Sequence, residues 1–208
     1  MEVFEAVQAG DLAKVRSLVE KGVDKDGTDL NGHTALCVAV RSGHLEIVQC
    51  LVEQGARIDG TSCGGWTPLH AAAALGGPFL DVVEYLLDQG ADRDRTNDVK
   101  DTPLHHAASY GNLKVVQCLL AYGADINVKN LWGQTPFDRA GSGKIKQAIR
   151  DAEQQRYAAN FGKKRIPEAD LRPPAPPSKE TKDGEGDEEE EEEEEDESSG
   201  DDDEDEEN

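Results

Sequence analysis

Along the first 150 residues, apolar positions fall into short blocks of two alternating kinds. In the first kind small residues predominate, as at Ala107 and Ala108, where they would allow a neighbouring helix to approach closely. In the second kind large apolar residues recur at helical spacing, as in the segment "LKVVQCLL" of residues 113–120. Polar segments that contain glycine separate the blocks. The pattern predicts pairs of short helices joined by turns.

The blocks repeat at a fixed interval. Four threonines open the similar phrases "TALCVAVRSG", "TPLHAAAALG", "TPLHHAASYG" and "TPFDRAGSGK", and successive threonines are 33, 35 and 33 residues apart. These threonines are Thr34, Thr67, Thr102 and Thr135. Four glycines have the same spacings, namely Gly22, Gly55, Gly90 and Gly123. A period near 33 residues indicates a stacked repeat protein, in which each unit buries its apolar face on its neighbours.

Each part of the repeated phrase has a physical explanation. The Thr102 hydroxyl is placed to cap the N-terminus of a helix, and Pro103 would occupy the first turn, where its missing N–H does no harm. Gly123 would end the second helix in the left-handed conformation that other residues adopt at higher cost. The two extra residues of the second full repeat fall at residues 76–78, in a turn between its helices that tolerates insertion.

The phrases "GWTPLHAAAALG" and "DTPLHHAASYGNLKVVQCLLAYGADIN" resemble the ankyrin repeat, a turn followed by two antiparallel helices. The resemblance covers roughly residues 1–153 and implies an all-α ankyrin-repeat solenoid, with three full repeats between an N-terminal and a C-terminal capping repeat. Departures are few: Ala35 and Cys37 replace the motif's Pro and His in the first full repeat, and Lys100 stands where the other turns have glycine. We expect a repeat domain over residues 1–153, a charged, proline-rich linker over 154–182, and a disordered acidic tail over 183–208.

The formal net charge of −22 belongs to the end of the chain. Of the 26 residues from Asp183 to Asn208, 20 are Asp or Glu, and without them 24 acidic residues face 22 basic ones. The body therefore lacks the basic footprint of a protein that binds nucleic acid directly. The sequence shows neither a basic, then apolar leader nor a run of about 18 apolar residues. We expect no membrane contact and an intracellular protein, cytoplasmic or nuclear or both.

Two adjacent histidines, His105 and His106, are the most conspicuous candidates for chemistry. Two histidines that bind one metal from a helix are four residues apart, whereas adjacent ones point in different directions. The resemblance implies that His105, like His70, hydrogen-bonds the adjoining turn. The cysteines lack a Cys-x-x-Cys spacing, and the segment "AGSGK" has Asp138 and Ile145 where a phosphate loop needs Gly and Ser or Thr. We therefore predict no catalytic residue, no metal site and no cofactor, and a protein that is not an enzyme.

The family resemblance places a partner protein along the turn tips and the inner face of the first helices. The candidate partner-binding residues are Leu30, Asn31, His33, Arg41, Trp66, Leu75, Val99, Asp101, Tyr110, Leu131 and Trp132. A partly apolar stripe over the C-terminal half would comprise Trp66, Leu75, Val99, Tyr110, Leu131 and Trp132. Aromatic residues in such a stripe are typical anchors of interfaces. The alternative is that the two tryptophans pack on the neighbouring turns.

Three residues are candidates for covalent modification. The segment "LLAYGADIN", which ends at Asn127, resembles the context in which ankyrin-repeat asparagines are hydroxylated by an asparaginyl hydroxylase. Ser198 and Ser199 each have an acidic residue three positions later, which suits an acidophilic kinase. Phosphate on these serines would deepen the negative charge of the tail.

These features favour a non-catalytic protein–protein interaction module, an adaptor or regulatory scaffold whose repeats bind one protein. The acidic tail would aid solubility, contact basic proteins such as histones, or fold back over basic residues of the repeats. The alternative is a histone-chaperone-like binder of basic proteins that acts mainly through the tail. In that case binding would vanish with the tail and fall steeply with salt.

Overall fold

The computed structural model describes residues 2–161 of the 208-residue chain, and these residues form paired helices. Within this range the regular structure is helical, apart from one isolated β-bridge between Thr28 and Thr34. The α-helices are α1 (Glu2–Gln8), α2 (Leu12–Glu20), α3 (Ala35–Ser42), α4 (Leu45–Glu53), α5 (Pro68–Leu75), α6 (Leu80–Asp88), α7 (Pro103–Ser109), α8 (Leu113–Ala121), α9 (Pro136–Arg139) and α10 (Gly143–Phe161). Two short 3₁₀ helices are η1 (Cys63–Gly65) and η2 (Gly77–Phe79). The all-α repeat architecture expected from the sequence is confirmed.

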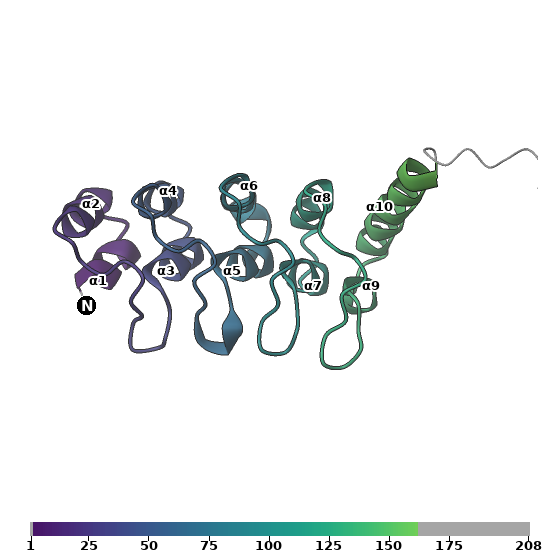
Figure 1. Ribbon diagram of the computed structural model, residues 1–208, viewed down its shortest axis with the longest axis horizontal. Helices are drawn as coiled ribbons and strands as arrows, with labels where there is room; N and C mark the ends of the chain where they lie inside the picture. The colour runs from purple at the N-terminus through teal and green to yellow at the C-terminus, as the bar shows by residue number, and fades with distance from the viewer. Residues whose placement is uncertain (1, 162–208) are drawn as a thin grey trace, which may run out of the picture. The chain divides into compact units, whose positions relative to one another are not determined.

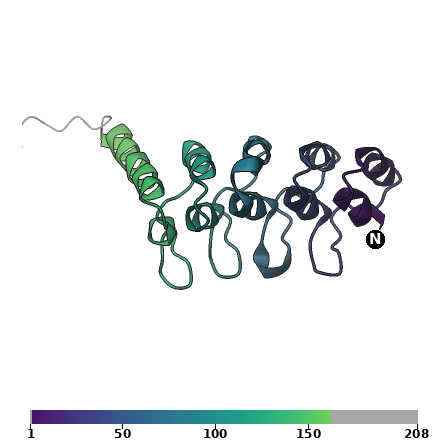
Figure 2. The ribbon, with the colours of Figure 1, turned by 180° about the vertical axis from the view of Figure 1, so that it is seen from behind.

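The helices form two rows (Figures 1 and 2). One row consists of α1, α3, α5, α7 and α9, and the other of α2, α4, α6, α8 and α10. Each helix packs on the next helix of its own row and on its partner in the same repeat. Long turns project beyond the first row, over residues 24–34, 57–67, 92–102 and 125–135. We call the surface formed by these turns and the outer side of the first row the turn face.

The core lies between the two rows. Leu51, Leu86 and Leu119 occupy equivalent positions on the second-row helices, and all three are fully buried. Burial of each such side chain contributes about 1.5–3 kcal/mol. The first-row helices contribute buried alanines such as Ala72 and Ala107, whose small side chains allow the helices of that row to pack closely.

The threonines cap the first-row helices, as the sequence predicts. Thr102 Oγ1 accepts a hydrogen bond from the backbone N–H of His105 at 3.4 Å, and His105 Nδ1 accepts one from the backbone N–H of Thr102 at 3.1 Å. The ring proton of His105 therefore lies on Nε2, which donates to the carbonyl oxygen of Gln134 in the next turn at 3.0 Å. His70 makes the equivalent contacts one repeat earlier. These two histidines tie the second full repeat to the third and the third to the C-terminal capping repeat, which confirms the structural role implied by the resemblance.

The two-residue insertion forms η2, in the predicted place between α5 and α6. The side-chain amide of Asn112 donates to the carbonyl oxygens of Ala73 and Ala74 at 2.8 and 3.1 Å. It thereby supplies hydrogen bonds to carbonyl groups at the C-terminal end of α5. Gly76 lies against this amide with a φ of 87°. A side chain at Gly76 would collide with Asn112 and strain the backbone, so glycine is required here.

The last helix is longer than expected. The sequence predicts a repeat domain that ends at residue 153 and a linker over residues 154–182, but α10 continues to Phe161, so residues 154–161 are helical. The Arg156 guanidinium donates to the carbonyl oxygen of Ala124 at 2.7 Å and anchors this part of α10 to the preceding repeat. The rest of the expected linker and the acidic tail lie outside the described residues.

Candidate protein-binding surface

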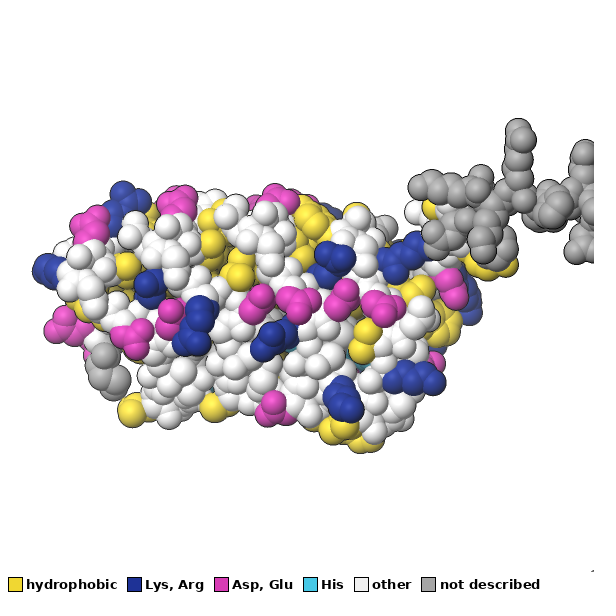
Figure 3. Space-filling model, viewed as in Figure 1, with side chains coloured by type: hydrophobic (Ala, Val, Ile, Leu, Met, Phe, Trp, Pro, Cys, Tyr) yellow, Lys and Arg dark blue, Asp and Glu magenta, His cyan; other side chains and the backbone are white. Residues whose placement is uncertain are grey.

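Five candidate partner-binding residues present large apolar side chains to solvent on the turn face. Leu30, Leu131 and Trp132 lie at turn tips and are 88%, 58% and 63% exposed. Leu75 and Tyr110 lie at the ends of α5 and α7 and are 44% and 62% exposed. Figure 3 shows hydrophobic side chains at the tips of several turns. These five residues give the turn face an apolar character that extends from the first full repeat to the C-terminal capping repeat.

Two members of the expected apolar stripe lie deeper. Trp66 is half-buried, and its ring centroid lies 4.3 Å from that of His106 in the next repeat. Val99 is also half-buried, and its carbonyl oxygen accepts a backbone hydrogen bond from Leu131 at 3.0 Å. Trp66 thus packs on His106 of helix α7 in the next repeat, whereas Trp132 is exposed.

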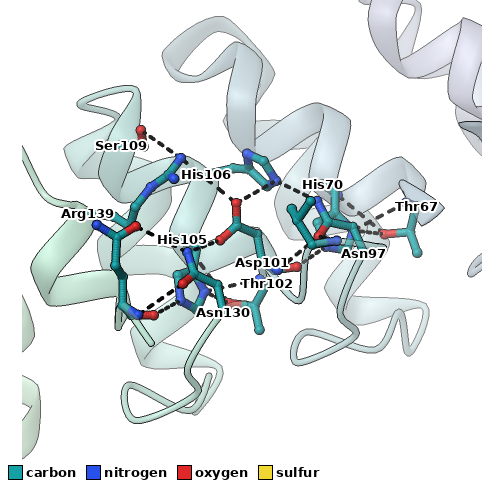
Figure 4. A network of polar contacts seen from close by, with 12 residues as sticks. Thr67, His70, Asn97, Asp101, Thr102, His105, His106, Ser109, Asn130 and Arg139 are labelled. Carbon is teal, nitrogen blue, oxygen red and sulfur yellow. Dashed lines mark hydrogen bonds and ion pairs between the residues drawn. The ribbon is translucent and has the colours of Figure 1, made fainter. Parts of the chain in front are cut away.

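Asp101 lies at the centre of a buried polar network and is only 2% exposed (Figure 4). Its Oδ1 accepts a hydrogen bond from the Asn130 side-chain amide at 2.9 Å, and its Oδ2 lies 3.9 Å from the Arg139 guanidinium. The Nε2 atom of His106 lies 4.0 Å from the same Oδ2 and 3.1 Å from the Asn97 amide nitrogen. The Asp101 carboxylate, a candidate partner-binding group, is therefore occupied within the stack.

His106 is neutral at pH 7. Burial lowers its pKa to about 4, and the neighbouring His70 contributes to the shift. Because the Asn97 amide donates to Nε2, the ring proton lies on Nδ1, and this nitrogen has no hydrogen-bond partner within residues 2–161. The contact between His106 and Asp101 is therefore not an ion pair.

The His106 ring stands where the preceding repeat has only the methyl group of Ala71, 35 residues earlier. Beside Ala71, a cavity of about 330 Å³ lies between the first and second full repeats. We call this cavity the open groove. Its lining includes Arg41, Ser62, Cys63, Trp66, Ala71 and Leu75. The equivalent place between the second and third full repeats holds the network around His106 and Asp101, and we call it the filled groove.

Arg41 lies at the open groove without an acidic partner. Its guanidinium is 2.9 Å from Nε2 of His33, and Nδ1 of the half-buried His33 is 3.4 Å from an Asp29 carboxylate oxygen. No acidic side chain of residues 2–161 forms an ion pair with Arg41. A second cavity of about 300 Å³, lined in part by the exposed Asn31, borders the same His33–Arg41 pair. An exposed cation thus borders two cavities on the turn face.

One turn position, which our sequence reasoning missed, differs between the two grooves. Oδ1 of Asn97 accepts hydrogen bonds from backbone N–H groups two and four residues later at 3.1 and 2.9 Å, and Oδ1 of Asn130 does so at 3.1 and 3.0 Å. Asp29 makes the same pair of bonds, each at 2.8 Å. Such side-chain bonds hold a turn in one conformation.

At the equivalent position, the open groove has Ser62. Its residue is 9% exposed, and its hydroxyl lies beside the Cys37 thiol without an oxygen or nitrogen partner in the described part of the chain. The signal was present in the sequence, because the four turn residues recur with the repeat period. They are Asp29, Ser62, Asn97 and Asn130.

Two cysteines and two histidines of the stack have pKa values that favour their neutral forms. Burial raises the pKa of the Cys37 thiol, and it raises the pKa of Cys118 to about 11, so neither supplies a thiolate at neutral pH. Burial lowers the pKa of His70 to about 4 and also lowers that of His105. Within residues 2–161, no three His, Cys, Asp or Glu side chains are grouped as metal ligands. No helix in the same range is long and apolar enough to cross a membrane.

The modification candidates fall in two places. Asn127 is exposed in the turn after α8, where its backbone N–H donates to Oδ1 of Asp125 at 2.9 Å. Ser198 and Ser199 lie outside the described residues.

Comparison with known families identifies the repeat. A family model described as ankyrin repeats (3 copies) matches residues 3–97 and, again, residues 74–150. No curated protein gives a significant match to the chain. Ankyrin repeats are typically non-catalytic and suggest a protein–protein interaction module. Because the two matches together cover most of the sequence, the chain belongs to the ankyrin-repeat family.

Proposed function

We propose that this protein is a non-catalytic interaction module, an adaptor or regulatory scaffold that binds a protein partner along the turn face. The observation that carries the proposal is the set of exposed large apolar side chains on that face. They are Leu30, Leu75, Tyr110, Leu131 and Trp132. Apolar side chains gathered on one exposed face mark contact sites for other proteins, and aromatic ones are typical anchors of binding energy.

The turns over residues 92–102 and 125–135, the second of which carries Leu131 and Trp132, are held in place by two sets of hydrogen bonds, which supports a preorganised surface there. From the first-row helices, His70 and His105 hydrogen-bond the carbonyl oxygens of the following turns. Between the tips, the backbone N–H of Asp98 donates to the carbonyl oxygen of Gly64 at 3.0 Å, and Leu131 donates to Val99 in the same way. A surface that is already ordered loses less conformational entropy on binding.

A triple alanine variant of Tyr110, Leu131 and Trp132 tests the proposal. Proteins captured from a lysate by the full chain are quantified by mass spectrometry and compared with those captured by the variant. The control is Val23→Ala, which removes an exposed apolar side chain that follows the second-row helix α2. We expect the triple variant to lose partners that the control retains. Equal capture by the triple variant and the control would show that the turn face is not the binding surface.

We further propose that the acidic segment 183–208 contacts basic partners or aids solubility. Its 20 acidic residues also favour a second candidate function, a histone-chaperone-like binder of basic proteins that acts mainly through this segment. Capture with the full chain and with residues 1–182, each at low and high salt, separates the two functions. Binding that survives the deletion supports the turn face, whereas binding that vanishes with the deletion and falls steeply with salt supports the alternative. An intracellular location, cytoplasmic or nuclear or both, fits either function.

Modification would add regulation to this scaffold. We propose Asn127 as a hydroxylation acceptor, since its exposed position in a turn supports access by a modifying enzyme. We propose Ser198 and Ser199 as phosphorylation sites on the basis of the acidic residues that follow them. Mass spectrometry of the protein from cells that contain the asparaginyl hydroxylase and an acidophilic kinase checks both proposals, and unmodified residues under those conditions would end them.

A further inference from the structure

We propose that the open groove binds an extended segment of the partner protein, which inserts one bulky apolar side chain beside Ala71 and places an Asp or Glu carboxylate on Arg41. This inference rests on the proposed interaction function. It specifies where on the turn face the partner is recognised and by which chemistry.

The open groove exists because two side chains are small where their counterparts are large. Ala71 stands at the position of His106, and Ser62 stands at the position of Asn97 and Asn130. The cavity of about 330 Å³ lies at the lower end of the range of ligand pockets, about 300–1,000 Å³. It therefore has room for a single aromatic or branched side chain rather than for a large cofactor.

The walls of the open groove suit an apolar group. Trp66, Ala71 and Leu75 line it, and Leu75 is still 44% exposed in the free protein. An inserted side chain would cover apolar surface of Trp66 and Leu75, and each Å² of apolar surface removed from water contributes about 25 cal/mol.

Two polar groups of the open groove can donate hydrogen bonds beyond those that they make within residues 2–161. The Arg41 guanidinium has only the His33 ring as a side-chain hydrogen-bond partner in the described residues, so most of its five N–H groups face no protein acceptor. The buried Ser62 hydroxyl likewise has no oxygen or nitrogen partner there. A carboxylate can accept two parallel hydrogen bonds from a guanidinium, and the carbonyl oxygens of an extended peptide can accept from a hydroxyl. An anionic peptide, whose carboxylate and carbonyl oxygens accept hydrogen bonds, would therefore fit these two groups.

The acidic end of the same chain does not meet both requirements. Residues 183–208 supply 20 carboxylates but contain no apolar side chain. They could compete for Arg41, but they could not fill the space beside Ala71. The segment "IPEADL" of residues 166–171 does place apolar residues beside acidic ones, so a synthetic peptide of this sequence is tested with the selected peptides. Binding of that peptide as tight as that of the selected ones would overturn the assignment of the groove to a partner.

Peptides selected on the full chain test the inference. A random dodecapeptide library displayed on phage is selected against the immobilised protein, and the enriched peptides are synthesised with a fluorescent label. Binding is measured by fluorescence anisotropy to the wild type, to Ala71→Leu, which fills the cavity, and to Arg41→Glu, which reverses the charge. Lys114→Glu, a charge reversal at an exposed second-row position, is the matched control.

We expect enriched peptides that pair a bulky apolar residue with Asp or Glu. Ala71→Leu and Arg41→Glu should each weaken binding about tenfold or more, whereas Lys114→Glu should leave it unchanged. Because the exposed Cys63 lines the open groove, the bound peptide should also slow the reaction of Cys63 with a bulky maleimide. If circular dichroism shows that Ala71→Leu does not fold, the exposed Arg41→Glu change and the Cys63 protection still decide the outcome.

Three further outcomes would overturn the inference. Peptides that bind Ala71→Leu and Arg41→Glu as well as the wild type, but fail to bind Trp132→Ala, would leave the proposed function in place and move the site elsewhere on the turn face. An all-acidic peptide that binds as tightly as the selected ones would show that charge alone is recognised. A selection without any binder would contradict the inference, and the capture experiment with the triple alanine variant would then decide the proposed function separately.

Discussion

The open groove and the filled groove are built on the same backbone plan, yet one holds a cavity and the other a buried polar network. Both grooves lie between first-row helices that have a threonine N-cap followed by proline or alanine. Trp66 lies in the wall of both grooves. The difference comes from Ala71 against His106 and from Ser62 against Asn97. In a repeat stack, the side chains at two positions therefore decide whether a groove is filled by a network that holds the repeats together or stays open to a binding partner.

Each choice has a physical cost. The filled groove keeps a histidine neutral by burial and leaves one of its ring nitrogens without a hydrogen bond within residues 2–161. The open groove leaves the Ser62 hydroxyl without an oxygen or nitrogen partner in the described residues, and it leaves Leu75 partly exposed. The comparison predicts that changes in the filled groove affect stability, whereas changes in the open groove affect binding.

The largest expected effect is a loss of stability in acid, to which the filled groove contributes through His106. Burial lowers the pKa of His70 and of His106 from 6.5 to about 4. The unfolded chain therefore binds these protons first as the pH falls, so stability is complete above pH 6.5 and is lost between pH 6.5 and about 4. Each histidine should account for roughly 3 kcal/mol of the loss at pH 4.

Urea unfolding of the wild type and of His106→Ala, at neutral pH and near pH 4, checks this prediction. The variant should lose less stability on acidification than the wild type does, because one of the two histidines is gone. Parallel pH profiles for the two proteins would mean that His106 is not buried in the neutral form.

Removal of the Asp101 carboxylate should have the next largest effect. Asp101→Ala leaves the buried Asn130 amide without one acceptor and the half-buried Arg139 guanidinium without its anion. We expect the free energy of unfolding to fall by about 3 kcal/mol. The control is Asp98→Ala in the same turn, where the side chain is exposed and the change should stay within about 0.5 kcal/mol. Similar losses in the two variants would refute a special role for the filled groove.

An exchange of the turn residue should cost somewhat less. Asn97→Ser gives the filled groove the residue of the open groove, and it removes two backbone hydrogen bonds together with the contact to His106. We expect a loss of about 2 kcal/mol in chemical unfolding. Asn31→Ser, a change at an exposed turn position, should alter stability by less than about 0.5 kcal/mol. An Asn97→Ser protein as stable as the wild type would show that the side-chain bonds of this turn are dispensable.

Those features of the fold that depend on local chemistry could be predicted from the sequence. The Thr102 cap and the insertion at residues 76–78 follow from the residues themselves and their repetition, whereas the bridging role of His105 was implied by the resemblance to the ankyrin repeat. The burial of Asp101 could not be predicted in this way, because the equivalent His33 and Trp66 are only half-buried. Its environment depends on Asn130 and Arg139 of the following repeat.

The extension of α10 and the open groove escaped prediction for different reasons. Residues 154–161 do not continue the repeated phrases, and the Arg156 guanidinium anchors their helix to the backbone carbonyl of Ala124 in the preceding repeat. The open groove results from the absence of bulk at Ala71 and Ser62. A small residue in a sequence indicates close packing as readily as it indicates a cavity, and only the positions of the surrounding side chains distinguish the two.

The smallest expected effect concerns Lys100, which lies in the turn of the filled groove between two N–H groups bonded to Asn97. Its φ is 60°, in the left-handed region, whereas the equivalent Gly32, Gly65 and Gly133 have φ values of 75°, 72° and 73°. This conformation costs a residue with a side chain about 1–2 kcal/mol, and the greater freedom of glycine in the unfolded chain offsets about 0.4–1 kcal/mol of the gain.

Lys100→Gly should therefore stabilise the protein by about 0.5 kcal/mol, which corresponds to a rise in melting temperature of about 1–2 °C. Lys129→Gly is the matched control, because Lys129 is an exposed lysine in the next turn without a positive φ, and its replacement should not stabilise the protein. Since the bonds of Asn97 hold Lys100 in this conformation, the gain should shrink when Lys100→Gly is combined with Asn97→Ser. A gain that is the same in both backgrounds would mean that the strain at Lys100 is independent of the filled groove.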